Sequence, residues 1–268
     1  KSTFSECTKT IFGVQVTMRK LHIIMPMAGE GSRFKQAGID TPKPLIKANG
    51  VPFFVRALSS IKDSFDLSEV KVTCIIQEKH DTYHTLSNGI IHELPFANII
   101  TLPKLTRGAV ETCLSALPFL IEDNDAILIM DCDLEWHCYN YTKSIKRLLE
   151  DDCSTISGML LSFNSDNPRY SYALTDGNIV KETAEKKVIS NNALVGAYFF
   201  NTTEDFLFAA DKLMSENKLS DVKEYYVSLL YNYLIKDGRT VIIHKVDSLY
   251  SFGTPEELYE YEHKSIHN

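Results

Sequence analysis

A short apolar run followed at once by small residues constrains the fold of this chain most strongly. The run LHIIM at residues 21–25 has the length and composition of a strand buried on both faces of a parallel sheet. The sequence PMAGEGSRF at residues 26–34, called the glycine loop below, then offers four small residues: Ala28, Gly29, Gly31 and Ser32. Small residues let the backbone approach a ligand, and successive N–H groups can point at phosphate oxygens. Because ligands in open α/β sheets bind outside the carboxyl ends of the strands, this loop is a candidate phosphate site.

The rest of the sequence alternates between strand-like and helix-like segments. We expect strands at residues 72–76, 98–102 and 126–130, and helices from Pro52 and at residues 108–120 and 141–149. Residues 154–201 alternate like strands, with an Asp-Gly hairpin turn at residues 175–178. Helices at residues 203–216 and 222–236, a strand at residues 240–246 and a helix from Pro255 follow. The pattern predicts a Rossmann-like α/β fold with a mixed, mainly parallel sheet flanked by helices and an antiparallel sub-region in the second half.

We expect one domain over residues 18–268, because no linker, internal repeat or low-complexity tract interrupts this pattern. Residues 1–17 are weakly patterned and are interpreted as an N-terminal extension, either natural or left over from production of the chain. A domain of this size can bury roughly three quarters of the surface that its unfolded chain would expose.

Charge and composition exclude several classes of function. The net charge of −7 offers no overall positive field for a nucleic-acid backbone or an anionic membrane. No apolar stretch approaches the roughly 20 residues that a membrane span needs, and the N-terminus lacks a secretory pattern. The six cysteines form no C-x-x-C pair or framework spacing. They are Cys7, Cys74, Cys113, Cys132, Cys138 and Cys153. A cytoplasmic protein that binds neither membranes nor nucleic acids is expected, whereas the sequence does not indicate its oligomeric state.

Two cations close to the glycine loop favour a phosphate site over a purely structural turn. Arg33 supplies a planar fork that matches phosphate geometry, and Lys43 is held between Pro42 and Pro44, which stiffen the segment. Ordinary solvated surface cations are the alternative. The third glycine of the dinucleotide fingerprint would fall at Phe34, and no Gly-Lys-Ser/Thr follows, so hydride transfer and P-loop chemistry are disfavoured.

Two acids follow the most apolar predicted strand, at residues 126–130. Asp131 and Asp133 should lie near the glycine loop, because neighbouring parallel strands deliver their carboxyl ends to one edge. Hard oxygen ligands there suit Mg²⁺, which typically takes one or two carboxylates together with substrate phosphates. Aspartates that only cap the loop are the alternative.

The pattern Gly29-x-Gly31-x-Arg33, followed by Pro42-Lys43-Pro44, resembles the nucleotide-sugar pyrophosphorylases, sugar-1-phosphate nucleotidyltransferases with a glycosyltransferase-A type fold. The resemblance runs from about Arg19 to Tyr261, so it assigns residues 18–268 to a nucleotidyltransferase domain. It implies that the glycine loop and Arg33 hold a nucleoside triphosphate and that Lys43 neutralises charge as the α-phosphorus is attacked. It further implies that Asp133 carries Mg²⁺, while Asp131 is a second ligand or binds the nucleoside.

Three further segments are similar to the same family. Gly108 and Ala109 would let the nucleobase lie flat against the backbone, with an ordinary helix start as the alternative. Lys186 would contact the phosphate of the acceptor, and Glu185 and Asn192 would contact its hydroxyls.

At Ser251, before Gly253-Thr254, the sequence departs from the family, since many relatives carry there an aspartate that completes the metal site. Trp136 follows the acidic pair and would either wall the substrate pocket or pack in the core.

The resemblance implies transfer of a nucleoside monophosphate from a triphosphate to a sugar 1-phosphate or similar small phosphate, with Mg²⁺ and release of pyrophosphate. Such a reaction would supply nucleotide-sugar precursors of surface polysaccharides. Cytidylyl transfer to a non-sugar phosphate such as phosphocholine is an alternative. A glycosyltransferase of the same fold, or a nucleotide-binding protein without turnover, is a further one. The expected partners are a nucleoside triphosphate and a small phosphorylated metabolite.

Overall fold

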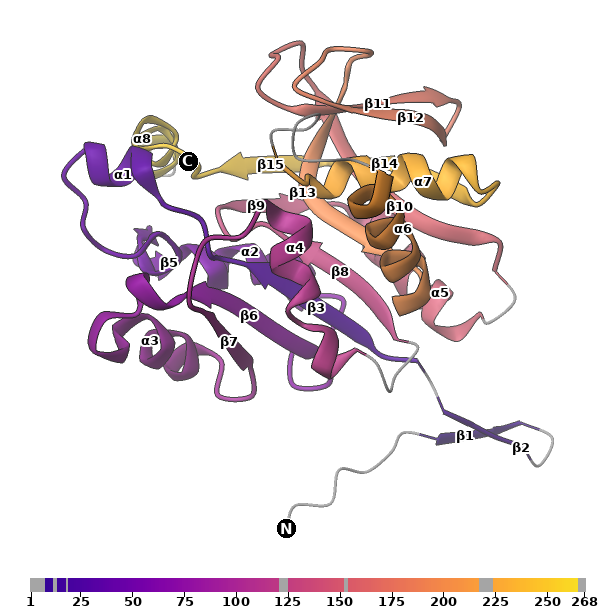
Figure 1. Ribbon diagram of the computed structural model, residues 1–268, viewed down its shortest axis with the longest axis horizontal. Coiled ribbons are helices and arrows are strands. Elements are labelled where there is room, and N and C mark those ends of the chain that lie inside the picture. The colour runs from indigo at the N-terminus through magenta and orange to yellow at the C-terminus, as the bar shows by residue number, and fades with distance from the viewer. Residues whose placement is uncertain are drawn as a thin grey trace.

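The computed structural model describes residues 8–11, 14–17, 19–120, 125–151, 154–216 and 224–264. Nine strands form its central sheet, in the order β10-β14-β12-β11-β13-β8-β3-β6-β7 (Figure 1). Their bounds are β3 Leu21–Pro26, β6 Lys71–Gln77, β7 Asn98–Leu102, β8 Ala126–Met130, β10 Ile156–Asn164, β11 Ser171–Asp176, β12 Ile179–Glu185, β13 Asn192–Phe200 and β14 Thr240–Lys245.

The first half of the chain forms the parallel part of this sheet. Strand β3 lies between β6 and β8 and is parallel to both. Ile24 of β3 is in register with Ile129 of β8, so the two strands end at the same edge. The glycine loop and the acids that follow β8 therefore leave the sheet side by side, as the sequence predicted.

The prediction of a mainly parallel sheet is wrong, because five of the nine strand pairings in the sheet are antiparallel. Strands β10 to β13 follow one another without an intervening helix, and short connections allow only antiparallel neighbours. Moreover, β13 pairs directly with β8, with Ala197 opposite Met130. The antiparallel strands thus continue the same sheet, and β14 returns parallel to β10.

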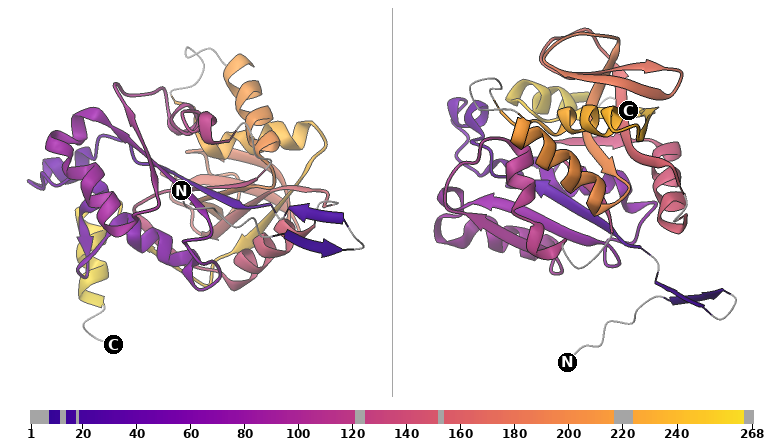
Figure 2. Two further views of the ribbon diagram at one scale, coloured as in Figure 1. Left: turned by 90° about the horizontal axis from the view of Figure 1, so that it is seen from below. Right: turned by 45° about the vertical axis from the view of Figure 1, so that its right-hand side comes forward.

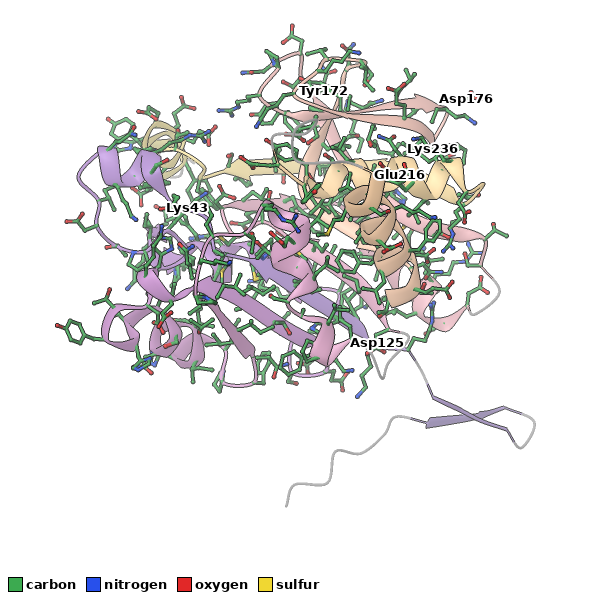
Figure 3. All side chains as sticks on the ribbon, in the orientation of Figure 1. Lys43, Asp125, Tyr172, Asp176, Glu216 and Lys236 are labelled. Carbon is green, nitrogen blue, oxygen red and sulfur yellow. The ribbon has the colours of Figure 1, made fainter. Side chains whose placement is uncertain are left out.

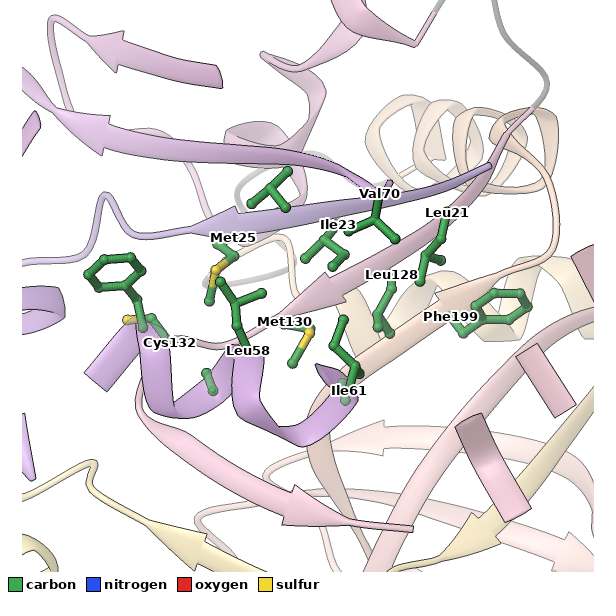
Figure 4. Close-up of a cluster of buried hydrophobic side chains, with 14 of the residues drawn as sticks. Leu21, Ile23, Met25, Leu58, Ile61, Val70, Leu128, Met130, Cys132 and Phe199 are labelled. Atoms are coloured by element: carbon green, nitrogen blue, oxygen red, sulfur yellow. The ribbon is translucent and has the colours of Figure 1, made fainter. Parts of the chain in front are cut away.

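Helices cover both faces of the sheet (Figure 2). Helices α2 (Phe53–Lys62), α3 (Thr85–Glu93) and α5 (Tyr139–Glu150) pack on one face, and α4 (Ala109–Leu114), α6 (Thr203–Glu216) and α7 (Leu230–Lys236) on the other. Alternation along β3 sends Ile23 into the first core and Ile24 into the second. Figure 4 shows Ile23 and Met25 above Leu58 and Ile61 of α2 in the first core. Trp136 is fully buried in this core, which leaves its packing role as the one that the structure supports.

Two predicted helices differ in extent from the observed ones. The helix expected at residues 108–120 ends at Leu114, and a 3-10 turn at Leu117–Phe119 contains Pro118, which lacks the N–H that a continuing helix would use. Of the helix expected at residues 222–236, the first two residues lie outside the described residues. Residues 224–226 are not helical, and a 3-10 turn at Val227–Leu229 then leads into α7.

Short elements close the edge at which the glycine loop lies, and of these the sequence predicted only the helix from Pro255. Strand β9 (Leu134–His137) pairs antiparallel with β15 (Ser248–Ser251), and α8 (Pro255–Lys264) follows. Helix α1 (Ser32–Gln36) begins inside the glycine loop, and β4 (Lys47–Ala48) pairs with β5 (Val51–Pro52).

A small aromatic cluster packs α1, the start of α2 and the segment after β15 against one another. Phe53, at the start of α2, lies 5.7 Å from Phe34 of α1 and 5.3 Å from Phe252, measured between ring centroids. All three side chains are fully buried. The glycine loop is thereby fixed against the segment that follows β15.

Residues 8–11 and 14–17 pair as the hairpin β1–β2, apart from the nine-stranded sheet (Figure 1). The boundary expected after residue 17 stays a prediction. No helix among the described residues is long and apolar enough to cross a membrane.

Candidate active site

The glycine loop and the Pro42-Lys43-Pro44 segment lie against each other. Gly31 has a φ of +62° at the start of α1, a conformation that favours glycine, and a Cβ there would stand 3.4 Å from the Cβ of Lys43. Ala28 is buried, whereas Gly29 and Ser32 are exposed. The pocket between the two segments measures only about 20 Å³, so it does not enclose a nucleotide. A ligand of the loop would lie across its open face.

Lys43 brings the loop into contact with the acidic strand end. Its Nζ donates to Oδ2 of Asp133 at 2.5 Å, with 27% of the Lys43 side chain and 20% of the Asp133 side chain exposed. Burial by itself lowers the pKa of Lys43, but the charge and the hydrogen bond of Asp133 outweigh it, so the pKa is raised. The ammonium group is therefore permanently charged at the edge of the sheet. Figure 3 shows Lys43 on the side of the molecule where α1 and α8 lie.

Asp131 lies against the neighbouring strand β13. Its N–H donates to the carbonyl of Gly196 at 2.8 Å, and a Cβ on Gly196 would stand 2.0 Å from Oδ2 of Asp131. Only glycine at position 196 leaves room for this carboxylate. Burial, the charge of Asp133 and, more weakly, the charge of Glu185 raise the pKa of Asp131 to about 7, against the opposing effect of Lys43.

The raised pKa of Asp131 gives a testable dependence of stability on pH. The folded state holds a proton on Asp131 that the unfolded state, with an ordinary pKa of 3.8, releases earlier. This contribution to stability is present below about pH 4 and is lost as the pH rises towards about 7. Asp131→Asn removes the titration, so the free energy of unfolding of the variant, relative to the wild type, should rise between about pH 5 and about pH 8. Metal-free denaturation at both pH values measures it, and a constant difference would contradict the assignment.

The segment after β15 completes the edge. The N–H of Phe252 donates to the carbonyl of Asp133 at 2.8 Å, and Nη1 of Arg33, an exposed side chain, lies 3.5 Å from the carbonyl of Gly253. Ser251 Oγ donates to Oε2 of Glu257 at 2.7 Å. Position 251 thus lies beside the Asp133 region.

Gly108 directly precedes α4, Ala109 begins it, and the backbone at Gly108 has a conformation that favours glycine. Gly108 has a φ of +135°, and a Cβ there would stand 2.5 Å from the backbone nitrogen of Tyr225. The N–H of Tyr225 donates to the carbonyl of Arg107 at 2.9 Å, and the N–H of Val110 donates to that of Tyr225 at 3.1 Å. The close packing against Tyr225 therefore explains glycine at position 108, whether or not a nucleobase binds there.

Two of the three expected acceptor residues, Glu185 and Lys186, lie at the end of β12 and directly after it, whereas Asn192 begins β13. Lys186 has a φ of +54°, and its Nζ donates to the hydroxyl of Tyr226 at 2.8 Å. Glu185 accepts hydrogen bonds from Ser228, at 3.0 Å, and from Ser171. Glu185 lies close enough to Asp131 for its charge to raise the pKa of Asp131, so the end of β12 adjoins the acidic residues that follow β8.

Asn192 has a different environment. Its amide donates to the carbonyl of Ala173 at 3.3 Å and to Oγ1 of Thr175 at 3.4 Å, within the β11–β12 hairpin. Among the described residues, the hydrogen bonds of Asn192 do not reach Glu185 or Lys186. The Asn192 amide is thus held by β11, and its contact with the acceptor stays a prediction.

A cavity of about 590 Å³ adjoins the C-terminal segment; Ser251 lines it, but none of the residues to which the sequence assigned a role in the site does. Arg169, Tyr170 and Glu257 do, and sequence reasoning missed all three. Arg169 forms an ion pair with Glu257 and stacks 4.6 Å above the ring of Tyr170. One signal was available for Glu257, since a long side chain in a first helical turn points back towards the helix start, here Gly253-Thr254.

The residues at this edge fit a hard divalent cation only with help from a substrate. No group of three or more acidic, cysteine or histidine side chains suited to a metal occurs in the described part of the chain. Asp133 offers a carboxylate that already faces a cation, the Lys43 ammonium group. Mg²⁺ accepts such a sparse set when phosphates complete its shell. Cys74, Cys113, Cys132 and Cys138 are free and buried and take no part.

Several solved structures share this fold. A nucleoside-diphosphate-sugar pyrophosphorylase from Vibrio cholerae RC9 matches with a TM-score of 0.77 and 26% identity, over 90% of this chain and 99% of that chain. A putative glucose-1-phosphate thymidylyltransferase from Bacillus anthracis, in complex with a sucrose, matches with a TM-score of 0.70 and 15% identity, over 91% and 95%. The inositol-1-phosphate CTP transferase from T. maritima matches with a TM-score of 0.67 and 14% identity, over 92% and 96%.

No protein-family model matches the chain, and neither does a curated protein sequence. The solved structures nevertheless cover nearly all of it. They confirm the resemblance predicted from the glycine loop and the Pro-Lys-Pro segment: the chain has the structure of a nucleoside-diphosphate-sugar pyrophosphorylase and of related nucleotidyltransferases.

Proposed function

We propose that the protein transfers a nucleoside monophosphate from a nucleoside triphosphate to a small phosphorylated metabolite, a sugar 1-phosphate, and releases pyrophosphate. The observation that carries this proposal is the contact of Lys43 with Asp133 directly against the glycine loop. It joins a permanent cation, a carboxylate and exposed backbone, which together suit a triphosphate and its metal. The pyrophosphorylase match and the two transferase matches support the same reaction type. A role in making surface-polysaccharide precursors is part of the proposal.

In this reaction an anionic phosphate oxygen of the acceptor attacks the α-phosphorus of the triphosphate. A new P–O bond forms, the bond from the α-phosphorus to the oxygen bridging it to the β-phosphorus breaks, and pyrophosphate leaves with that electron pair. No side chain has to remove a proton from the attacking group. Catalysis is therefore positioning and neutralisation of charge between two anions.

Each proposed residue has one task in that scheme. The backbone of the glycine loop and Arg33 hold the triphosphate, and Lys43 neutralises its phosphates at the α-position. Asp133 would hold Mg²⁺, which supplies further neutralisation of the phosphate charge when bound. Asp131, whose pKa is raised to about 7, is about half protonated at neutral pH, and its protonated form is able to donate a hydrogen bond to the nucleotide.

Lys186 is proposed to bind the phosphate of the acceptor, and Lys186→Ala should separate the two substrates. Lys186 is exposed, and its ammonium group lies 4.7 Å from the ring centroid of Tyr226, so a phosphate can reach the N–H donors that Tyr226 does not use. We expect the variant to raise the KM for the acceptor by roughly tenfold or more, with little change in the KM for the triphosphate. Lys187→Ala, at the exposed neighbouring lysine, is the matched control. Equal effects on both substrates would argue against separate donor and acceptor halves.

The decisive test of the function is a pyrophosphate-release screen of five nucleoside triphosphates against sugar phosphates and alcohol phosphates, with Mg²⁺. Release that requires both substrates, with formation of the nucleotide-linked product, would support the proposal. Release only with CTP and phosphocholine would identify a cytidylyltransferase for a non-sugar phosphate. A glycosyltransferase would consume a finished nucleotide-sugar without forming pyrophosphate, and a nucleotide sensor would bind a triphosphate without turnover.

A further inference from the structure

Two carboxylates face each other across Gly253. A Cβ on this glycine would stand 3.2 Å from Oδ2 of Asp133 and 3.2 Å from Oε2 of Glu257. The two oxygens are therefore separated by no more than twice that distance, with no side chain from position 253 between them. A third oxygen, Ser251 Oγ, would lie 3.6 Å from the same Cβ. Position 253 thus leaves a gap lined by three oxygen atoms from three different segments.

The carboxylate of Glu257 is oriented by partners on either side. Arg169 forms its ion pair with Oε1, and the hydroxyl of Ser251 donates to Oε2 at 2.7 Å. Ser251, in turn, is fixed by the pairing of β15 with β9, opposite Leu134. With Oε1 occupied by the guanidinium, Oε2 is the oxygen that faces Gly253 and Asp133.

Charge at this edge favours a cation in the gap. Lys43 contacts Oδ2 of Asp133, the same oxygen that faces Gly253, and it comes from the opposite side of the site, next to Gly31. The two carboxylates repel each other, and Lys43 beside Asp133 and Arg169 beside Glu257 offset that repulsion while no metal is bound. Mg²⁺ prefers one or two carboxylates completed by phosphate oxygens and water, a set that Asp133, Glu257 and a triphosphate would provide.

We propose that Glu257 is the second carboxylate of the metal site and that the first turn of α8 supplies it in place of an acid on β15. The inference rests on the proposed function. Ser251 is then a positioning residue, which holds Oε2 of Glu257 towards Asp133, and Arg169 is the counterion that keeps Glu257 in place when the metal is absent. Glycine at position 253 is required because any side chain there would fill the gap.

Mn²⁺ binding, measured by electron paramagnetic resonance, tests the inference without turnover. The measurement uses the whole chain with α,β-methylene analogues of the five nucleoside triphosphates. Glu257→Gln retains a hydrogen-bonding side chain but not the charge, and it should weaken Mn²⁺ binding by about tenfold or more. Glu256→Gln, which removes an exposed acid from the same helical turn, should leave Mn²⁺ binding within about twofold of the wild type. Thermal unfolding verifies that both variants are folded.

Two further variants distinguish a metal ligand from an ion-pair partner. If Glu257 serves only to hold Arg169, Arg169→Gln and Glu257→Gln should weaken Mn²⁺ binding equally. If Glu257 is a ligand, Arg169→Gln should retain Mn²⁺ binding, because the carboxylate is still present. In the Glu257→Gln background, Ser251→Asp should restore Mn²⁺ binding by returning a carboxylate to the gap.

Unchanged Mn²⁺ binding in folded Glu257→Gln overturns the inference, and so does equal weakening in Arg169→Gln and Glu257→Gln. A failure of the proposed function would be distinguishable from a failure of this inference. In that case no pair of substrates yields pyrophosphate, whereas the dependence of Mn²⁺ binding on Glu257 is still measured.

Discussion

Lys43→Ala should lower the rate of pyrophosphate release by roughly two to four orders of magnitude, equivalent to about 3 to 5 kcal/mol of transition-state stabilisation. Lys43 is the cation that the structure holds against both Gly31 and Asp133, and its raised pKa keeps it charged through the neutral range. An alanine leaves the departing phosphate charge without this neutralisation. The rate constant kcat, measured with both substrates saturating, is the relevant quantity.

The control for Lys43→Ala is Lys47→Ala, which removes an exposed lysine from the neighbouring strand β4. It should leave kcat unchanged, and both variants should melt within a few degrees of the wild type. A folded Lys43→Ala variant with a near-wild-type rate would remove Lys43 from the mechanism. Arg33→Ala should lower kcat over the same range, because Arg33 is proposed to hold the triphosphate. Its side chain is exposed on the glycine loop, and its structural contact is a 3.5 Å approach to the carbonyl of Gly253, so the variant should remain folded.

Gly108→Ala should be the most destabilising of the substitutions considered, with a loss of about 3 kcal/mol or more in the free energy of unfolding. The new Cβ would stand 2.5 and 2.7 Å from the backbone nitrogen and oxygen of Tyr225, and the φ of +135° is unfavourable for alanine. Backbone atoms cannot turn aside as a side chain can, so α4 or the segment at Tyr225 has to shift. Chemical denaturation of the unliganded protein measures the loss.

Gly29→Ala is the matched control for Gly108→Ala, since a Cβ on Gly29 would meet no atom within 4 Å. Its stability should be close to that of the wild type. Wild-type stability in Gly108→Ala would show that the close packing against Tyr225 is wrong. If Gly108→Ala instead weakens triphosphate binding at unchanged stability, that result would support the predicted contact of Gly108 with the nucleobase.

The parallel half of the fold could be predicted because its strands carry their pattern locally. Strands β3 and β8 are buried on both faces, so each is a continuous apolar run, and the end of each run predicts where the chain leaves the sheet. The Asp-Gly turn between β11 and β12 was equally local, with Gly177 at a φ of +57°. An antiparallel arrangement of residues 154–201 was predicted, but the pairing of β13 with β8 was not, because an apolar run does not indicate which strand it lies beside. Its pairing is decided by the chain connections and by the room that Gly196 gives Asp131.

The site could be predicted to a similar extent. A lysine between two prolines and two acids after a buried strand pointed to the same sheet edge, where Lys43 and Asp133 are in contact. The partners of Glu257 could not be predicted, because Arg169 and Ser251 reach it only through the folded positions of the β10–β11 connection and β15. Likewise, β9 and β15 have four residues each and no strong alternation, and they are strands because they pair with each other. The contact of the Asn192 amide with the carbonyl of Ala173 could not be predicted either, because it depends on the folded position of β11 beside β13.

The cluster of Phe34, Phe53 and Phe252 has a consequence for the order in which the molecule is assembled. Arg33 and Gly253 face each other across 220 residues of sequence, so the glycine loop acquires its final neighbours only after β15 and α8 have been synthesised. Chains fold from the N-terminus during synthesis, and contacts between distant segments form late. A nascent chain could therefore complete the parallel strands and still lack a closed site. The edge of the sheet at the glycine loop therefore closes only when the ring of Phe252 packs against Phe53 at the start of α2.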